Sequence, residues 1–392
     1  MVAEVEISVI IPTRDDAESL KKILEAIHNQ TFIPKEIVIV DSSTNSDVEC
    51  IVEGSKWTVP IVYHIEKKAY PGKARNVGVQ LANGDWIAFL DSRTIPKKDW
   101  LQRYYHLVQV YHSEVVFGVT QFESASPFQK TLRAATYGKI GHHTVPGTLI
   151  MKNVFNDSGR FLEHVRMGED IEWRERLTRS GFTIHRPDES VVTYHGLPDN
   201  FNTTLRKYVK SAYHTARLNI LRNVKDAYLS FVIILSAIIL PKWNHLIEGW
   251  DVNPLFIPHI TKIYLMALVC LLLIYQLLHY LVFRNIPRTL FSRTLKIMVI
   301  IFITLAVYKW NAIIAGWMED AVLYVPHITK LYVGSLILVS VLYRGIILPL
   351  KRKVEPGFLF PFRWIKVSLL GLFLDLAKAP GYLFGAIRSF FK

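Results

Sequence analysis

Cysteine is scarce in this chain. The 392 residues include only Cys50, in a polar stretch, and Cys270, within an apolar run. We do not expect these two cysteines to pair, so a disulfide framework is excluded. The sequence therefore does not require an oxidising compartment.

Acidic residues are fewer than basic ones. There are 33 aspartates and glutamates against 46 lysines and arginines, which gives a formal net charge of +13. Such an excess indicates an anionic partner: nucleic acid, a membrane surface or a substrate. No basic helix with base-reading residues stands out, so nucleic acid is disfavoured. Many cations flank apolar segments, which favours membrane lipids.

Long apolar runs are missing up to about residue 225. The opening MVAEVEISVIIPT lacks the basic segment and apolar core of a signal peptide, and we expect its apolar part to be a strand. Short apolar runs alternate with segments of helical spacing. The expected strands are 7–12, 36–41, 61–65 and 86–91, and the expected helices are 17–30 and 72–83. This alternation predicts an α/β fold with a mostly parallel sheet.

Polar residues follow several of these expected strands. Pro12 and Thr13 end the first, Asp41 ends the second and Asp91 ends the fourth. Ligands of parallel α/β sheets bind beyond the carboxyl ends of the strands. We therefore expect a nucleotide-sized site there.

Five motifs occur in an order and spacing that resemble the inverting family 2 glycosyltransferases of the non-processive type. They are SVIIPTRDDAESL, EIVIVDSSTN, PGKARNVGVQLANGDWIAFLDS, GRFLE and GEDIEWRERLTRSGF, within about residues 6–197. The resemblance implies a GT-A nucleotide-binding domain that uses a nucleotide-sugar donor.

The resemblance assigns nucleotide contacts to the first strand ends. Asp41 would accept a hydrogen bond from the donor's base, and Thr13, after Pro12, would contact the nucleoside. A turn cap for the following serines is the structural alternative for Asp41.

A second set of nucleotide contacts would come from Lys73, Arg75 and Asn76. Gly72 before them lets the backbone approach a ligand, and a helix N-terminus with cations suits phosphate. In the family the matching Arg-Asn pair lines the nucleotide site. A solvated basic turn is the alternative.

Asp91 and Arg93 occupy the place of the family's Asp-x-Asp motif. That motif holds a divalent metal, Mg²⁺ or Mn²⁺, which neutralises the leaving nucleoside diphosphate. Here arginine replaces the second carboxylate. Three readings stay open: a weakened metal site on Asp91, with His195 as a further ligand; direct phosphate binding by Arg93; or an inactive site.

The pair Glu169–Asp170 carries the proposed catalysis. Inversion needs a base on the face opposite the leaving group. The resemblance gives that role to Asp170, with Glu169 orienting the acceptor or a nearby cation. A helix-capping role is the alternative for both.

Apolar segments follow the α/β part. Four of them, at about 227–241, 263–283, 294–308 and 331–350, predict transmembrane helices. Lys242–Asn244 (KWN) recurs as Lys309–Asn311, and Pro258–Lys262 (PHITK) recurs as Pro326–Lys330. We infer an all-α membrane domain built from two tandem-repeated hairpins.

These patterns predict four parts. They are a GT-A domain (1–204), a juxtamembrane amphipathic helix (205–226), the transmembrane domain (227–350, repeat copies about 227–283 and 294–350) and a basic interfacial C-terminus (351–392) with a break at Pro380–Gly381. Basic connectors place the catalytic domain and both termini in the cytoplasm of a multi-pass cell-membrane protein.

The expected function is transfer of one sugar to a polyprenyl phosphate or lipid-linked glycan. The alternatives are a processive polysaccharide synthase and a silent scaffold that binds nucleotide or lipid. The sequence is compatible with an oligomer.

Overall fold

The computed structural model describes residues 5–54, 56–218, 220, 302, 306 and 337–390. The chain divides into two compact units, Met1–Ile220 with Val339–Lys392, and Leu221–Leu338. Almost all described residues belong to the first unit. The expected spans 227–241, 263–283 and 294–308 lie outside the described residues apart from 302 and 306, as does 331–336 of the fourth. No helix among the described residues is long and apolar enough to cross a bilayer.

The N-terminal half of the sheet is parallel, as the sequence predicts. Its spatial order is β3-β2-β1-β4. The bounds are Ile7–Thr13 for β1, Glu36–Asp41 for β2, Ile61–Ile65 for β3 and Trp86–Phe89 for β4. The whole of β2 is buried, as its continuous apolar run indicates.

The sheet then continues through strands of mixed direction. Strand β7 pairs antiparallel with β4 and β6, β9 runs parallel to β6, and β5 pairs antiparallel with β9. The bounds are Thr94–Pro96 for β5, Val115–Phe122 for β6, His142–Met151 for β7, Ile184–His185 for β8 and Val192–Tyr194 for β9. The result is a GT-A-like α/β sheet, mostly parallel, with an antiparallel insertion.

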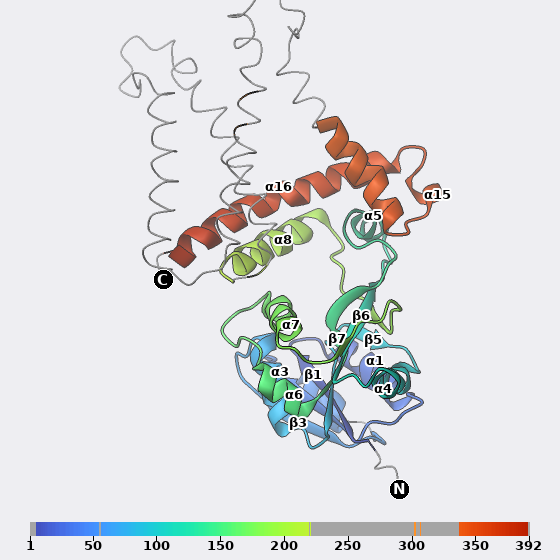
Figure 1. The fold of residues 1–392 in the computed structure, drawn as a ribbon, viewed down its shortest axis with the longest axis vertical. Coiled ribbons are helices and arrows are strands. Elements are labelled where there is room, and N and C mark those ends of the chain that lie inside the picture. The colour runs from blue at the N-terminus through green and yellow to red at the C-terminus, as the bar shows by residue number, and fades with distance from the viewer. Residues whose placement is uncertain are drawn as a thin grey trace, which may run out of the picture. The chain divides into compact units, whose positions relative to one another are not determined.

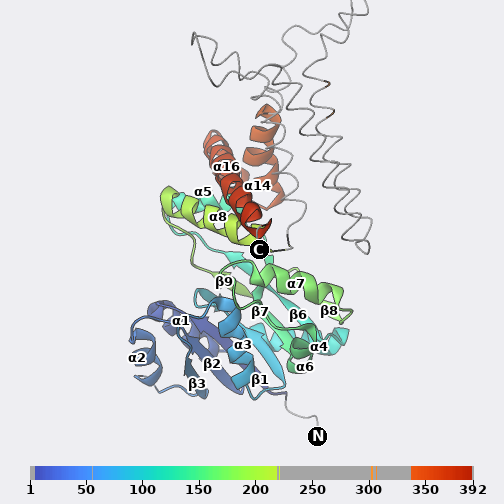
Figure 2. The same ribbon diagram turned by 90° about the vertical axis from the view of Figure 1, so that its left-hand side faces the viewer.

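Helices cover both faces of this sheet (Figures 1 and 2). On one face, Val9 and Ile11 of β1 pack in a core with α1; on the other, Ile10 packs in a core with α3 and α7. This alternation follows from the two-residue period of a strand. The helices are α1 (Ala17–His28), α2 (Asp47–Glu53), α3 (Pro71–Leu81), α4 (Trp100–Tyr111), α6 (Lys152–Ser158) and α7 (Glu169–Arg179).

The C-terminal segment packs on the α/β part. Leu370 and Leu374 form one apolar cluster with Leu132 and Tyr208. The elements concerned are α5 (Pro127–Thr136), α8 (Phe201–Ala216), the π-helical turn η2 (Tyr343–Ile347), α14 (Leu348–Lys351), α15 (Pro356–Leu359) and α16 (Arg363–Phe390). Figures 1 and 2 show α8 alongside α16.

Residues 205–220 and 351–392 belong to the same compact unit as the α/β domain. Their expected roles at a membrane interface stay predictions. One sequence expectation about this region is wrong. The helix is not broken at Pro380, which lies inside α16. A β-carbon on Gly381 would lie 2.5 Å from the Val209 carbonyl oxygen, and one on Gly385 would lie 2.6 Å from the Ala216 β-carbon. The glycines therefore allow α8 and α16 to approach closely.

Candidate active site

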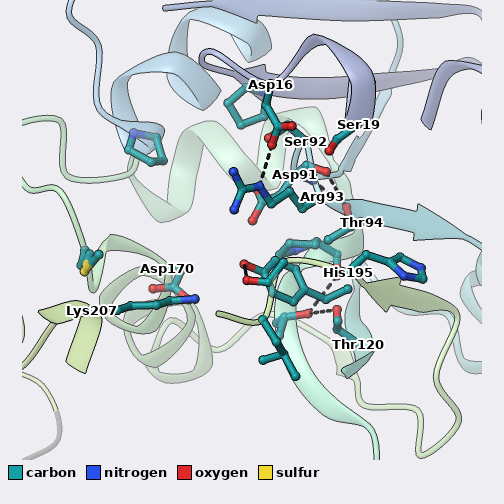
Figure 3. A pocket seen from close by; sticks show the side chains of 18 of the residues that line it. Asp16, Ser19, Asp91, Ser92, Arg93, Thr94, Thr120, Asp170, His195 and Lys207 are labelled. Atoms are coloured by element: carbon teal, nitrogen blue, oxygen red, sulfur yellow. Dashed lines mark hydrogen bonds and ion pairs between the residues drawn. The ribbon is translucent and has the colours of Figure 1, made fainter. Parts of the chain in front are cut away.

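A cavity of about 1430 Å³ opens at the carboxyl ends of the parallel strands. Its walls come from the ends of β1 and β4, the start of α3, the start of α7, the end of β9 and one side of α8. This is the edge of the sheet where the sequence places the site. Figure 3 shows labelled side chains that line it.

The ends of β1 and β2 supply hydroxyl groups. Pro12, Thr13 and Ser42 line the cavity, and the Thr13 Oγ1 and Ser42 Oγ atoms are buried without a hydrogen-bond partner in the described part of the chain. Buried polar atoms are seldom left unpaired, so these two hydroxyls are suited to a polar ligand. Asp41 is not part of the lining. Its carboxylate accepts hydrogen bonds from the Tyr63 hydroxyl (2.8 Å) and the Ser43 backbone N–H (2.9 Å), which is the turn-capping alternative.

Arg75 is buried at the start of α3, with 3% of its surface exposed. Its Nη2 donates to Asp91 Oδ1 at 2.6 Å, and its Nη1 donates to Glu169 Oε1 at 3.0 Å. Burial alone lowers the pKa of Arg75, but the two carboxylates raise it further than burial lowers it, so the guanidinium stays charged. Arg75 therefore ties the carboxylate after β4 to the first residue of α7.

Lys73 and Asn76 do not line the cavity. The Lys73 ammonium donates to Glu66 at 2.7 Å. The Asn76 side-chain amide donates to the Phe161 carbonyl oxygen at 2.9 Å and accepts from the Phe161 N–H at 3.0 Å. Asn76 thus fixes the segment before α7.

The predicted metal ligands do not form a metal site by themselves. One oxygen of Asp91 is held by Arg75. Figure 3 shows the His195 ring directed away from Asp170 and Lys207, and this histidine is exposed. No group of three or more acidic, histidine or cysteine residues with metal-binding geometry occurs in the described part of the chain.

Arg93 stands where the second carboxylate of the motif would be. Its Nε donates to Asp16 Oδ2 at 2.6 Å, and its guanidinium also interacts with the Tyr194 hydroxyl. The hydrogen bond to Asp16 raises the Arg93 pKa although burial opposes it. Arg93 lines the cavity, so the motif contributes a fixed positive charge.

Glu169 and Asp170 open α7, but they lie in different environments. Gly168 before them has φ +94, the left-handed conformation that glycine adopts readily. Burial raises the pKa of Glu169 to about 7; the Arg75 charge opposes this shift, and Asp170 adds to it. Asp170 lines the cavity, and no described residue makes a hydrogen bond or ion pair with its carboxylate. Asp170 is therefore free to accept a proton from a bound group.

One wall of the cavity was missed by sequence reasoning. Thr203, Lys207, Ser211 and Thr215 of α8 all line it. They are spaced by four residues, which places them on one face of a helix. That spacing was visible in the sequence, but a solvated helix face has the same pattern.

Residues 8–164 match the family described as Glycosyl transferase family 2. The glycosyltransferase AglE of Haloferax volcanii is 26% identical over 192 residues, 45% of this chain and 63% of the relative. The glycosyltransferase GlyG of Streptococcus pneumoniae is 32% identical over 29% of this chain and 38% of its own. The chain thus spans less than two thirds of these relatives.

Among solved structures, S. aureus TarS 1–349 in complex with UDP-GlcNAc matches with a TM-score of 0.42 and 20% identity, over 55% of this chain and 67% of that one. The family match thus lies within the first unit of this chain, which is similar to glycosyltransferases over that part.

Proposed function

We propose that the chain transfers a single sugar, with inversion, from a nucleotide-sugar donor to a lipid-linked acceptor at the cytoplasmic face of the cell membrane. The observation that carries the proposal is that Asp170, whose carboxylate has no ion-pair or hydrogen-bond partner among the described residues, lines the same cavity as Asp91 and Arg93. A base and a cation in one site are what displacement of a nucleoside diphosphate from an anomeric carbon requires.

The chemistry follows from these positions. An acceptor hydroxyl oxygen attacks the anomeric carbon from the face opposite the diphosphate, and the carbon–oxygen bond to the diphosphate breaks. Asp170 takes the hydroxyl proton, and Arg93 stabilises the negative charge that develops on the diphosphate. The buried Thr13 and Ser42 hydroxyls, which lack partners among the described residues, are suited to the nucleoside.

The exposed face of α16 supports a lipid-linked acceptor. It carries an apolar stripe opposite the buried Val367, Leu370 and Leu374. The stripe consists of Ile365, Leu369, Phe373, Leu376 and Phe384, and Phe373 is 53% exposed; the exposed Phe362 directly precedes the helix. Exposed cations accompany it at Lys351, Lys353, Arg363 and Lys366. A helix with an apolar face and cations nearby suits an anionic bilayer surface. Because α16 packs against α8, a bilayer on this face would lie near the cavity.

Contact between α16 and lipid can be measured on the full chain in anionic nanodiscs. A fluorophore on Phe373→Cys should be quenched by spin-labelled lipid, because that side chain would lie among acyl chains. The native Cys50 and Cys270 are first replaced by serine. The matched control is Lys21→Cys on the exposed side of α1, where we expect no quenching. Equal quenching at both positions would contradict a specific α16 contact.

Transfer itself is tested by a donor screen. The full chain in nanodiscs that contain polyprenyl phosphate or a polyprenyl-linked glycan should release nucleoside diphosphate from one donor, and the lipid should gain one sugar. Each donor is tried with Mg²⁺, with Mn²⁺ and with chelator. A ladder of longer products would show a processive synthase instead, and no turnover of any donor would reject the proposal.

A further inference from the structure

The wall that α8 contributes lies outside the family match at 8–164. It contains one cation, Lys207, between the hydroxyl-bearing Thr203 and Ser211. Helix α8 is held in place by its close packing on Gly381 and Gly385 of α16. The position of Lys207 is therefore defined by the fold of the whole first unit.

Lys207 has no carboxylate partner among the described residues. Its ammonium lies 5.7 Å from the centroid of the Tyr194 ring. Figure 3 shows the side chain reaching into the cavity from the α8 side, whereas Arg93 enters from the side of Asp16. Burial lowers the pKa of Lys207, and the charge of Arg93 lowers it further. Both cations line the same cavity, and of the two only Arg93 has an acidic partner among the described residues, Asp16.

This arrangement costs free energy when the cavity holds no anion, since like charges repel and a partly buried ammonium has lost hydration. An anion bound between the two cations would reverse both costs. A phosphate group fits best, because guanidinium binds phosphate oxygens with paired N–H donors and lysine adds a point charge.

We propose that Lys207 and Arg93 together bind a phosphate group on the α8 side of the cavity. This subsite deepens the proposed function and rests on it for the identity of the ligand. The phosphate belongs either to the donor's diphosphate or to the lipid acceptor. In both cases two side chains supply the positive charge that a carboxylate-bound metal supplies in an Asp-x-Asp motif.

The test is equilibrium binding to the full chain in nanodiscs, with chelator present. The two probes are inorganic pyrophosphate and a short-chain prenyl monophosphate. Lys207→Met should weaken binding of one probe roughly 10- to 100-fold, which is the usual range for a charge-assisted hydrogen bond. Lys207→Arg should retain most of the affinity. The matched control is Lys210→Met, an exposed cation on the same helix, which should bind as the wild type does.

The two probes separate the sources. Loss for pyrophosphate alone assigns Lys207 to the donor's diphosphate, and loss for the prenyl phosphate alone assigns it to the acceptor. Unchanged binding of both probes in Lys207→Met, or no binding by the wild type, would overturn the proposal. Binding does not require turnover, so Lys207-dependent binding without any transfer would refute the proposed function and leave the subsite standing.

Thermal unfolding distinguishes a binding role from a structural one. Without ligand, Lys207→Met should unfold at the same temperature as the wild type or higher, because it removes the repulsion from Arg93. Pyrophosphate or prenyl phosphate should raise the wild-type Tm and leave that of the variant unchanged. A lower Tm for the unliganded variant, with an equal rise on ligand addition, would mean that Lys207 only supports the fold.

Discussion

Replacing Asp170 with asparagine is expected to reduce kcat for a hydroxyl acceptor by about 10² to 10⁴-fold, the usual contribution of a general base. Asparagine keeps the shape of the side chain but cannot take the acceptor's proton. Asp170 has no ion pair among the described residues, so the change should leave the fold and donor binding intact. The measurement is single-turnover transfer from a labelled donor, with donor affinity measured separately.

The matched control is Glu175→Gln on the same helix, where the carboxylate pairs with Arg179 at 3.1 Å and does not line the cavity. It should transfer at the wild-type rate. A kcat for Asp170→Asn within threefold of the wild type would reject the base assignment if the acceptor is a hydroxyl. A polyprenyl phosphate acceptor attacks through an oxygen that is already ionised near pH 7, so a small loss with that acceptor alone would identify it as the substrate.

Replacing Arg75 with methionine is expected to destabilise the first unit by about 3–5 kcal/mol near pH 8. The change leaves the buried Glu169 and the half-buried Asp91 without the guanidinium that both contact. The expected drop in Tm is roughly 10 °C, measured by thermal unfolding of the full chain. Transfer should fall as well, because the tie between Asp91 and the start of α7 is lost.

The loss of stability in Arg75→Met should depend on pH in a defined direction. Burial raises the pKa of Glu169 to about 7 from an ordinary 4.5. The folded state therefore holds this proton more tightly than the unfolded chain. The contribution of this proton to the free energy of unfolding is fully present below about pH 4.5 and is lost as the pH rises through about 7. Without Arg75 the pKa of Glu169 rises further, so the Tm difference from the wild type should be larger at pH 8 than at pH 5.

Two variants complete this test. Arg75→Lys keeps the positive charge, but a single ammonium group cannot contact both carboxylates as the two guanidinium nitrogens do. Its Tm should therefore lie between those of the wild type and Arg75→Met. Arg179→Met breaks an exposed pair and should cost about 1 kcal/mol or less. If Arg75→Met and Arg179→Met had the same Tm at pH 8, the buried ion-pair network would carry no stability.

The α/β alternation was predictable because each element carries its own signal. The continuous apolar runs of β1 and β2 and the apolar face of α1 follow from strand and helix periodicity, and all three form within one residue or two of the predicted bounds. The antiparallel pairing of β7 was not predicted, because strand direction depends on contacts between residues far apart in the sequence.

The composition of the candidate site was likewise predictable only in part. The sequence predicted that Thr13, Asp91, Arg93 and Asp170 would share a site, and all four line one cavity. It also grouped Asp41, Lys73 and Asn76 with them, and these three do not line it. They form hydrogen bonds with Tyr63, Glu66 and Phe161 instead. The roles assigned to these residues stay predictions.

By itself the sequence determined the strand and helix order and the residue types available at the strand ends, because local periodicity and short motifs are properties of neighbouring residues. Only the tertiary structure decided which of those residues pair with other side chains of the protein and which face the cavity. Arg75 is bound by two carboxylates, whereas Asp170 and Lys207 lack acidic or basic partners among the described residues. The reason is physical: a side chain's charge is encoded locally, but its partner comes from a distant segment that folding brings beside it.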